Sequence, residues 1–220
     1  MKTHTKEFQE NLTPERAFEV LVEGNKRFIN NLKVNRNLHQ QLNDTQHGQY
    51  PFAVALSCMD SRTSVELIFD QGLGDIFSIR VAGNIVNDDI VGSMEYACQV
   101  AGSKLIVVLG HTKCGAITGA CDSVEMGNLT GLLEKIKPAI EKTRLHNEPA
   151  DTRPDIEKVA SLNVLHSIDE ILERSSILRA LLREGKIGIA GGIYSIENGM
   201  AHFIKKMFAE PQLEDLRRTA

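Results

Sequence analysis

Residues 52–56 read Phe-Ala-Val-Ala-Leu, and residues 105–109 read Leu-Ile-Val-Val-Leu. Neither run alternates between apolar and polar residues, which is typical of strands that are buried on both faces. Two further runs, residues 76–81 and the glycine-rich residues 187–194, predict two more strands. Helical patterns lie between the runs, and strands that alternate with helices indicate parallel pairing. The sequence therefore predicts an α/β fold with a mainly parallel sheet of at least four strands flanked by helices.

The N-terminal region is predicted to form a helical arm. Residues 1–12 are polar, and residues 30–48, which are rich in Asn and Gln, have the character of an irregular segment. Between them, Thr13-Pro14-Glu15 supplies the N-cap, the proline and the acidic first turn that open a helix. We expect one domain over residues 1–220, with the arm and its helices over 1–48 and the α/β core over 49–220. The arm is expected to pack on a partner subunit.

Composition excludes several classes of function. The chain has 220 residues, with 25 Lys and Arg against 29 Asp and Glu, a formal charge of −4. A weakly acidic chain is a poor candidate for binding nucleic acid through a broad basic surface. Its apolar runs are far shorter than the roughly 20 residues of a membrane span, and its N-terminus does not resemble a signal peptide. Four cysteines are too few for a disulfide scaffold, so we expect a cytoplasmic protein whose patterned cysteines bind metal or take part in chemistry.

Polar clusters follow two of the predicted strands. Residues 57–62 read Ser-Cys-Met-Asp-Ser-Arg, and residues 110–115 read Gly-His-Thr-Lys-Cys-Gly. In open α/β sheets, ligands bind beyond the carboxyl ends of the strands. If the two strands are neighbours, a donor set that suits zinc converges there; it consists of Cys58, Asp60, His111 and Cys114. A single cysteine at a strand end is more often a small buried apolar residue, but two such clusters together favour metal binding.

The pair formed by Asp60 and Arg62 favours a catalytic zinc site over a structural one. A closed structural site usually has four Cys or His ligands, and only three such residues are present here. Arg62 is spaced to pair with the Asp60 carboxylate through two hydrogen bonds. Zinc then keeps one position open for water, whose pKa can fall to about 7. Because two thiolates already neutralise the ion, we expect a less acidic water than a three-histidine site gives, and greater activity at alkaline pH.

The pattern Cys58-x-Asp60-x-Arg62 followed by His111-x-x-Cys114-Gly115 resembles the β-class carbonic anhydrases. The resemblance extends from about Thr13 to residues 191–203, and it includes segments 23–28, 80–84 and 92–97. It implies a lyase that reversibly hydrates carbon dioxide to bicarbonate and a proton by attack of zinc-bound hydroxide, with one zinc ion per chain. It also implies a homodimer or homotetramer. From the composition, we expect no nucleic-acid or membrane partner.

The resemblance assigns roles to the residues around the zinc ion. Cys58, His111 and Cys114 are the implied ligands. Asp60 and Arg62 are the implied dyad, in which Asp60 accepts a hydrogen bond from the zinc-bound water and Arg62 keeps Asp60 ionised. In the closed state of some members, Asp60 instead fills the fourth zinc position.

Four further residues match family positions that contact the substrate. Gln49 matches the glutamine that hydrogen-bonds the substrate, often across a dimer interface. The backbone N–H of Gly115 is expected to steady the developing bicarbonate charge. Phe77 and Tyr96 match residues that line the apolar pocket for the small neutral substrate.

Two alternatives remain open at this point. The first is a hydrolase for carbon disulfide or carbonyl sulfide on the same fold and metal site. The second is a zinc-stabilised regulatory or scaffold module without turnover, against which the intact Asp60–Arg62 pair argues.

Cys98 and Cys121 share helical faces with apolar residues and are expected to pack in the core. The remaining histidines that we considered lack metal-ligand spacing; they are His39, His47, His146, His166 and His202.

Overall fold

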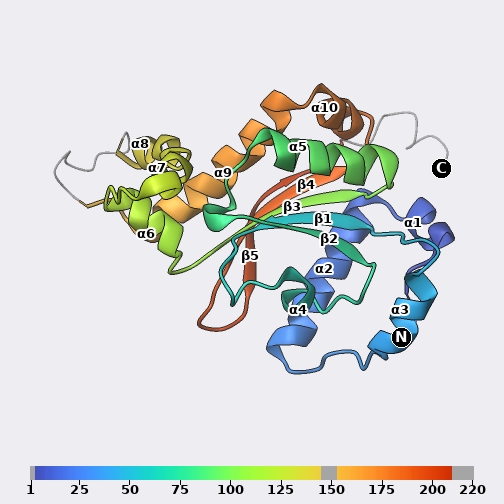
Figure 1. Cartoon of the computed structure of the whole chain (residues 1–220). Helices are drawn as coiled ribbons and strands as arrows, with labels where there is room; N and C mark the ends of the chain where they lie inside the picture. Colours follow the sequence, from blue (N-terminus) through green and yellow to red (C-terminus); the bar gives the residue numbers. More distant parts are fainter. Residues whose placement is uncertain (1–2, 145–152, 210–220) are drawn as a thin grey trace, which may run out of the picture.

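A five-stranded sheet forms the centre of the computed structural model, which describes residues 3–144 and 153–209 (Figure 1). The strands lie in the order β2-β1-β3-β4-β5. Their bounds are β1 (Ala53–Ser57), β2 (Ile76–Arg80), β3 (Leu105–His111), β4 (Gly188–Tyr194) and β5 (Ala201–Met207). Strands β1 to β4 pair in parallel, and β5 is antiparallel to β4. The predicted α/β fold with a mainly parallel sheet is confirmed, and β5 adds a fifth strand to the four predicted.

Helices connect the strands and precede them. Before the sheet come α1 (Lys6–Asn11), α2 (Pro14–Ile29) and α3 (Leu38–Thr45). Between β1 and β3 lie α4 (Val65–Ile68), the 3-10 turn η1 (Ala82–Asn84), α5 (Asp88–Glu95) and the π-helical turn η2 (Tyr96–Val100). After β3 come α6 (Gly115–Cys121), α7 (Gly127–Glu134), α8 (Lys137–Arg144), α9 (Ile156–Arg174) and α10 (Ser176–Arg183). The expectation of an irregular stretch over residues 30–48 is wrong where α3 lies, because Asn37 caps that helix and Gln41 is buried.

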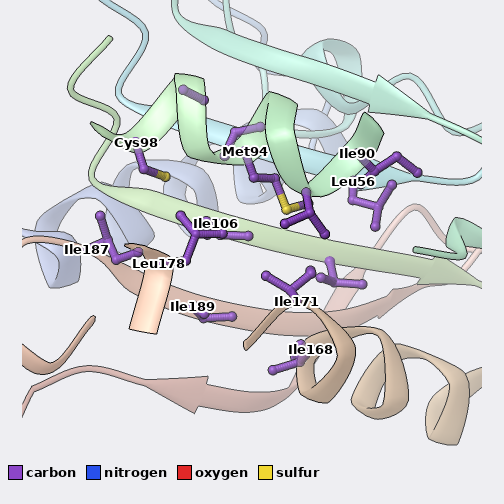
Figure 2. Packing of buried hydrophobic residues seen from close by; sticks show 14 of the residues in the cluster. Leu56, Ile90, Met94, Cys98, Ile106, Ile168, Ile171, Leu178, Ile187 and Ile189 are labelled. Atoms are coloured by element: carbon purple, nitrogen blue, oxygen red, sulfur yellow. The ribbon is translucent and has the colours of Figure 1, made fainter. Parts of the chain in front are cut away.

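The sheet is covered by helices on both faces. Along β1, Val54 and Leu56 face a core with α5, α9 and α10, whereas Ala53 and Ala55 face a second core with α2 and α4. Figure 2 shows the first core, in which Ile106 of β3 lies among apolar side chains of α5 and α9. Both faces of β1 and β3 are therefore dry, as their unbroken apolar sequences predict.

The order of the strands places the topological switch point beside β1. From β1 the chain passes through α4 to β2 on one side, and it then returns through α5 to β3 on the other side. Successive right-handed crossovers in opposite directions put α4 and α5 on opposite faces of the sheet. The carboxyl ends of β1 and β3 thus form the topological switch point, where open α/β sheets bind ligands.

Helices α1 and α2 contact their own chain, and Ala17 and Leu21 of α2 are buried in the second core. Thr13 caps α2 as predicted, since its side chain accepts a hydrogen bond from Arg16 N at 3.2 Å. In α1, the Gln9 side chain donates to Pro51 O at 2.7 Å and to Ala101 O at 2.8 Å. Packing of this arm on a partner subunit stays a prediction, as does the single-domain division.

Among residues 3–144 and 153–209, no helix combines the length and apolar character that a membrane span requires.

A buried ion cluster joins the N-terminal segment to α4. The Asp70 side chain is 2% exposed and accepts hydrogen bonds from Arg27 Nε at 2.6 Å and from Arg36. Burial raises the pKa of the Asp70 carboxyl, but hydrogen bonds from Arg27 and Arg36 outweigh it, so the pKa lies below its ordinary value. Asp70 therefore stays ionised and holds α2 and the following segment against the end of α4.

We expect Asp70→Asn to lower the free energy of unfolding at pH 7 by about 3 kcal/mol, because it leaves two arginines without their buried partner. Since the folded-state pKa of Asp70 is depressed, its contribution is present above the unfolded pKa of about 3.9 and disappears as pH falls through the folded-state value. Urea unfolding at pH 7 and pH 3 measures both effects. Asp122→Asn, which breaks a pair with exposed Arg153, is the control and should change stability by at most about 1 kcal/mol.

Candidate metal centre

Two neighbouring strands carry the candidate ligands. Cys58 directly follows β1, and His111 is the last residue of β3. Ser57 lies beside Leu109 in the register of these strands, so both ligands emerge at the same edge of the sheet. Between His111 and Cys114, Lys113 adopts a φ of 55°, a left-handed turn that brings the chain back before α6 begins at Gly115. The switch point thus collects all three predicted Cys and His ligands.

The three side chains fit a zinc ion. Their candidate ligand atoms all lie within 4.8 Å of one another, and all three residues are buried. Cys58 Sγ and Cys114 Sγ are 3.9 Å apart, close to the roughly 3.8 Å that two thiolates adopt on a tetrahedral zinc with Zn–S bonds of about 2.3 Å. His111 Nδ1 lies 2.9 Å from Thr112 O, while its buried Nε2 has no hydrogen-bond partner among the described residues. When Nδ1 donates, Nε2 carries a lone pair, and a cation would satisfy it.

The two thiols do not ionise independently. The hydrogen bond from Cys114 lowers the pKa of Cys58 to about 4, and the same hydrogen bond together with burial raises the pKa of Cys114. Cys114 therefore keeps its proton more readily than Cys58 does. Binding of a divalent cation requires release of that proton, since the thiolate is the ligand.

The Asp60 carboxylate pairs with Arg62 at the mouth of this cluster. Arg62 Nε donates to Oδ1 at 2.9 Å and Nη2 donates to Oδ2 at 2.7 Å, and the Arg62 backbone N–H reaches Oδ1 at 2.9 Å. These hydrogen bonds from Arg62 lower the pKa of Asp60 far below its ordinary value. The carboxylate is ionised at neutral pH, and it is held by Arg62 rather than grouped with the three candidate ligands.

Two residues to which we assigned no role in the metal site from the sequence hold the loop after β1. Thr63 Oγ1 donates to the backbone carbonyls of Cys58 and Asp60, both at 2.8 Å. Arg80, at the end of β2, donates to the same two carbonyls at 3.3 Å and 2.6 Å. The backbone that carries one ligand and the acidic residue is therefore fixed from two sides. No spacing rule links Arg80 to this loop, because the contact depends on the pairing of β1 with β2.

The structure separates the predicted substrate-contact residues. Gly115 lies next to Cys114 at the start of α6, beside the cluster. Gln49 is exposed and precedes the amino end of β1, so a five-residue strand of about 16 Å lies between it and Cys58. In Figure 1, α3, which precedes Gln49, and α6 lie at opposite ends of the sheet. Within one chain, Gln49 and the cluster do not meet.

Phe77 and Tyr96 form an aromatic pair away from the cluster. Their ring centroids are 6.3 Å apart, and the rings meet edge to face. Both side chains line an open depression of about 650 Å³ beside β2 and α5, together with Val54. Val54 pairs with Phe77 and lies four residues before Cys58, which corresponds to about 13 Å along the strand. The pair therefore lines a separate surface of the same chain.

Within residues 3–144 and 153–209, the other cysteines and histidines that we considered lie outside the cluster. Cys98 is buried in the core as predicted, and burial raises the pKa of its thiol to about 12. Cys121 is half-buried and packs against the apolar residues below the cluster. His39, His47 and His202 are exposed and His166 is half-buried. His146 lies outside the described residues.

Comparison with known proteins identifies related enzymes. The family model described as carbonic anhydrase matches residues 53–201. Carbonic anhydrase 2 of Mycobacterium tuberculosis (strain ATCC 25618 / H37Rv) is 33% identical over 201 residues, which cover 87% of this chain and 93% of that protein. Among solved structures, a tetrameric β-carbonic anhydrase of Sordaria macrospora superposes with a TM-score of 0.66 at 26% identity, over 73% of this chain and 84% of the other. The β-carbonic anhydrase CafA of Aspergillus fumigatus gives a TM-score of 0.67 at 26% identity, over 80% and 85%.

Proposed function

The chain belongs to the β-class carbonic anhydrase family, and from this premise we propose that it reversibly hydrates carbon dioxide with one zinc ion held by Cys58, His111 and Cys114. The observation that carries the proposal is the buried three-donor cluster at the switch point, with its unpartnered His111 Nε2. Two sulfurs and one imidazole nitrogen are a donor set typical of tetrahedral zinc sites, so we prefer zinc to other divalent cations at this site.

When bound, zinc supplies Lewis-acid chemistry that lowers the pKa of a coordinated water and so provides the attacking hydroxide at near-neutral pH. The ionised Asp60 carboxylate can only accept hydrogen bonds. Asp60 therefore accepts a hydrogen bond from the O–H of the attacking hydroxide. This hydrogen bond orients a lone pair of the hydroxide oxygen toward the carbon of the substrate. Arg62 holds both oxygens of Asp60, which keeps the carboxylate charged and away from the cluster.

Two further features of the site support the proposal. The backbone N–H of Gly115, at the amino end of α6, donates to the substrate oxygen on which negative charge develops. In the closed state, the Asp60 carboxylate would leave Arg62 and would itself bind the zinc ion held by Cys58, His111 and Cys114. Because Arg62 makes three hydrogen bonds with Asp60, we propose that the open arrangement is the resting one.

The position of Gln49 supports a catalytic unit of more than one copy. Gln49 lies at the opposite end of β1 from its own cluster, so it reaches a substrate only in the site of another chain. Phe77 and Tyr96 line an exposed and mainly apolar depression, which we propose a second copy covers in the same arrangement. We therefore propose a homodimer or homotetramer, in which the Gln49 amide and these two rings complete a neighbouring substrate pocket and the N-terminal arm packs on the partner.

Stopped-flow measurement of carbon dioxide hydration tests the proposal. We expect fast turnover from the zinc-loaded protein, increasing from pH 7 to pH 9 because two thiolates donate more charge than histidines do. Chelator-treated protein should be inactive, and added zinc should restore turnover. Zinc-loaded protein without turnover at any pH would contradict the proposal. Sulfide release from carbonyl sulfide or carbon disulfide would then indicate the hydrolase, and its absence would indicate a zinc-stabilised scaffold.

A further inference from the structure

Helix α9 contacts the metal centre indirectly, through the turn η1. In this turn, the Gly83 backbone N–H donates to Cys58 Sγ at 3.4 Å. The carbonyl of the same residue accepts a hydrogen bond from Asn163 Nδ2 of α9 at 2.8 Å. A continuous path of hydrogen bonds therefore runs from a helix side chain, through one glycine, to a candidate zinc ligand.

Gly83 needs support to hold this geometry. Its φ is +67°, in the left-handed region that glycine enters most easily. A Cβ at this position would lie 2.9 Å from Ile136 Cδ1 and 3.3 Å from Ala116 Cβ, so the turn also lies tightly against its surroundings. Glycine has little conformational preference of its own. The direction of its N–H is therefore set by the groups that hold the turn.

Asn163 is an unusual residue for the buried face of a helix. It is 1% exposed, and its Oδ1 has no hydrogen-bond partner among the described residues. A buried amide with one unsatisfied oxygen costs free energy that an apolar residue of similar size does not. The hydrogen bond to the Gly83 carbonyl is the contact that accounts for an amide at this position.

We propose that Asn163 is a positioning residue for the metal centre, which holds η1 so that the Gly83 N–H donates to the Cys58 thiolate. The inference rests on the proposed function, because it requires that this thiolate binds the metal ion. An N–H donor withdraws charge from the sulfur and fixes its orientation, and outer-shell groups of this kind tune the first ligands. Loss of the hydrogen bond from Asn163 frees the turn and weakens the N–H···S contact.

The chain contains a matched control on the same helix. Ser167, one turn after Asn163, is 2% exposed, and its Oγ donates to Asn84 O at 3.0 Å. Both side chains therefore bond to consecutive carbonyls of η1. The Asn84 N–H, however, donates to Val81 O at 3.0 Å and not to sulfur. Ser167→Ala thus removes a similar buried hydrogen bond to the same turn without touching the residue that contacts Cys58.

The test uses the full chain loaded with cobalt(II) or zinc. In the cobalt(II) protein, we expect Asn163→Ala to shift the thiolate-to-metal charge-transfer band to longer wavelength, because the sulfur loses a donor. We expect zinc affinity, measured by competition with a chromophoric chelator, to fall by about 10- to 100-fold. Ser167→Ala should leave the band in place and change zinc affinity less than threefold, even where it lowers thermal stability.

Asn163→Leu, which has a similar volume and no donor, keeps the test decisive if the alanine variant does not fold. The inference would be overturned if Asn163→Ala or Asn163→Leu, once folded, kept the wild-type band and the wild-type zinc affinity. It would also be overturned if Ser167→Ala shifted the band as far as the Asn163 variants do. Wild-type protein that binds neither metal would instead refute the proposed function. Wild-type binding with normal spectra in both Asn163 variants refutes the positioning role alone.

Discussion

Cys114→Ala is expected to abolish zinc binding at stoichiometric concentration and to lower carbon dioxide hydration by about a thousandfold. The cluster has three donors, and removal of one sulfur leaves a thiol and an imidazole that hold zinc far more weakly. A Lewis acid contributes several kcal/mol to the reaction, and about 4 kcal/mol corresponds to a thousandfold. Zinc content by atomic emission and turnover by stopped flow measure the two effects on the same sample.

The control for this variant is Cys121→Ala. Cys121 is the last residue of α6, the helix that follows Cys114, and it lies outside the metal cluster. Its substitution removes one thiol of the four in the chain, so the total thiol content changes equally in both proteins. We expect one zinc per chain and wild-type turnover. A fully active, zinc-loaded Cys114→Ala protein would show that the metal is bound elsewhere.

Asp60→Asn is expected to keep zinc and to lower kcat by at least about 100-fold, as removal of a positioned acid–base group usually does. The asparagine Oδ1 still accepts from Arg62, but the Nδ2 group that replaces the second oxygen donates and does not accept. The attacking group then has no acceptor for its O–H. Because Asp60 is not one of the three clustered donors, zinc stoichiometry should remain one per chain.

A second bidentate pair in the chain provides the control for Asp60→Asn. Asp122 accepts from Arg153 Nε at 2.9 Å and from Nη2 at 3.0 Å, the same arrangement at an exposed site. Asp122→Asn breaks that pair and should leave kcat and zinc content unchanged. Undiminished kcat in Asp60→Asn would exclude the proposed role of the Asp60–Arg62 dyad, whereas loss of zinc would assign Asp60 to the ligand set.

Complete burial explains why the sequence predicted β1 and β3 so directly. Strands β1 and β3 are covered on both faces, so their sequences are unbroken apolar runs. Strand β5 escaped notice because it is an edge strand whose residues are mostly exposed or half-exposed, and its sequence Ala-His-Phe-Ile-Lys-Lys-Met gives no clear pattern. Helix α3 was hidden by its Asn and Gln residues, and it buries only Gln41.

In the metal site, too, some features could be predicted from the sequence and others could not. The spacings in residues 57–62 and 110–115 predicted that three donors meet, because adjacent parallel strands end at one edge of the sheet. The support around those donors was not predictable from spacing. Asn163 contacts Gly83 across 80 residues of sequence, and Arg80 contacts Cys58 only because β2 pairs with β1. Such contacts depend on tertiary structure that no local pattern encodes.

The attachment of the ligands to β1 and β3 has a kinetic consequence. These strands have partners on both sides, and backbone amides in such central strands exchange with solvent only through the largest opening motions of a protein. Cys58 and His111 are continuous with them, whereas Asp60 and Arg62 lie on the more exposed loop. In the proposed enzyme, a zinc ion held by these ligands should therefore leave only on the timescale of near-global unfolding. The loop that carries Asp60 and Arg62 should rearrange much faster, so we expect loop motion and zinc release to have separate kinetic barriers.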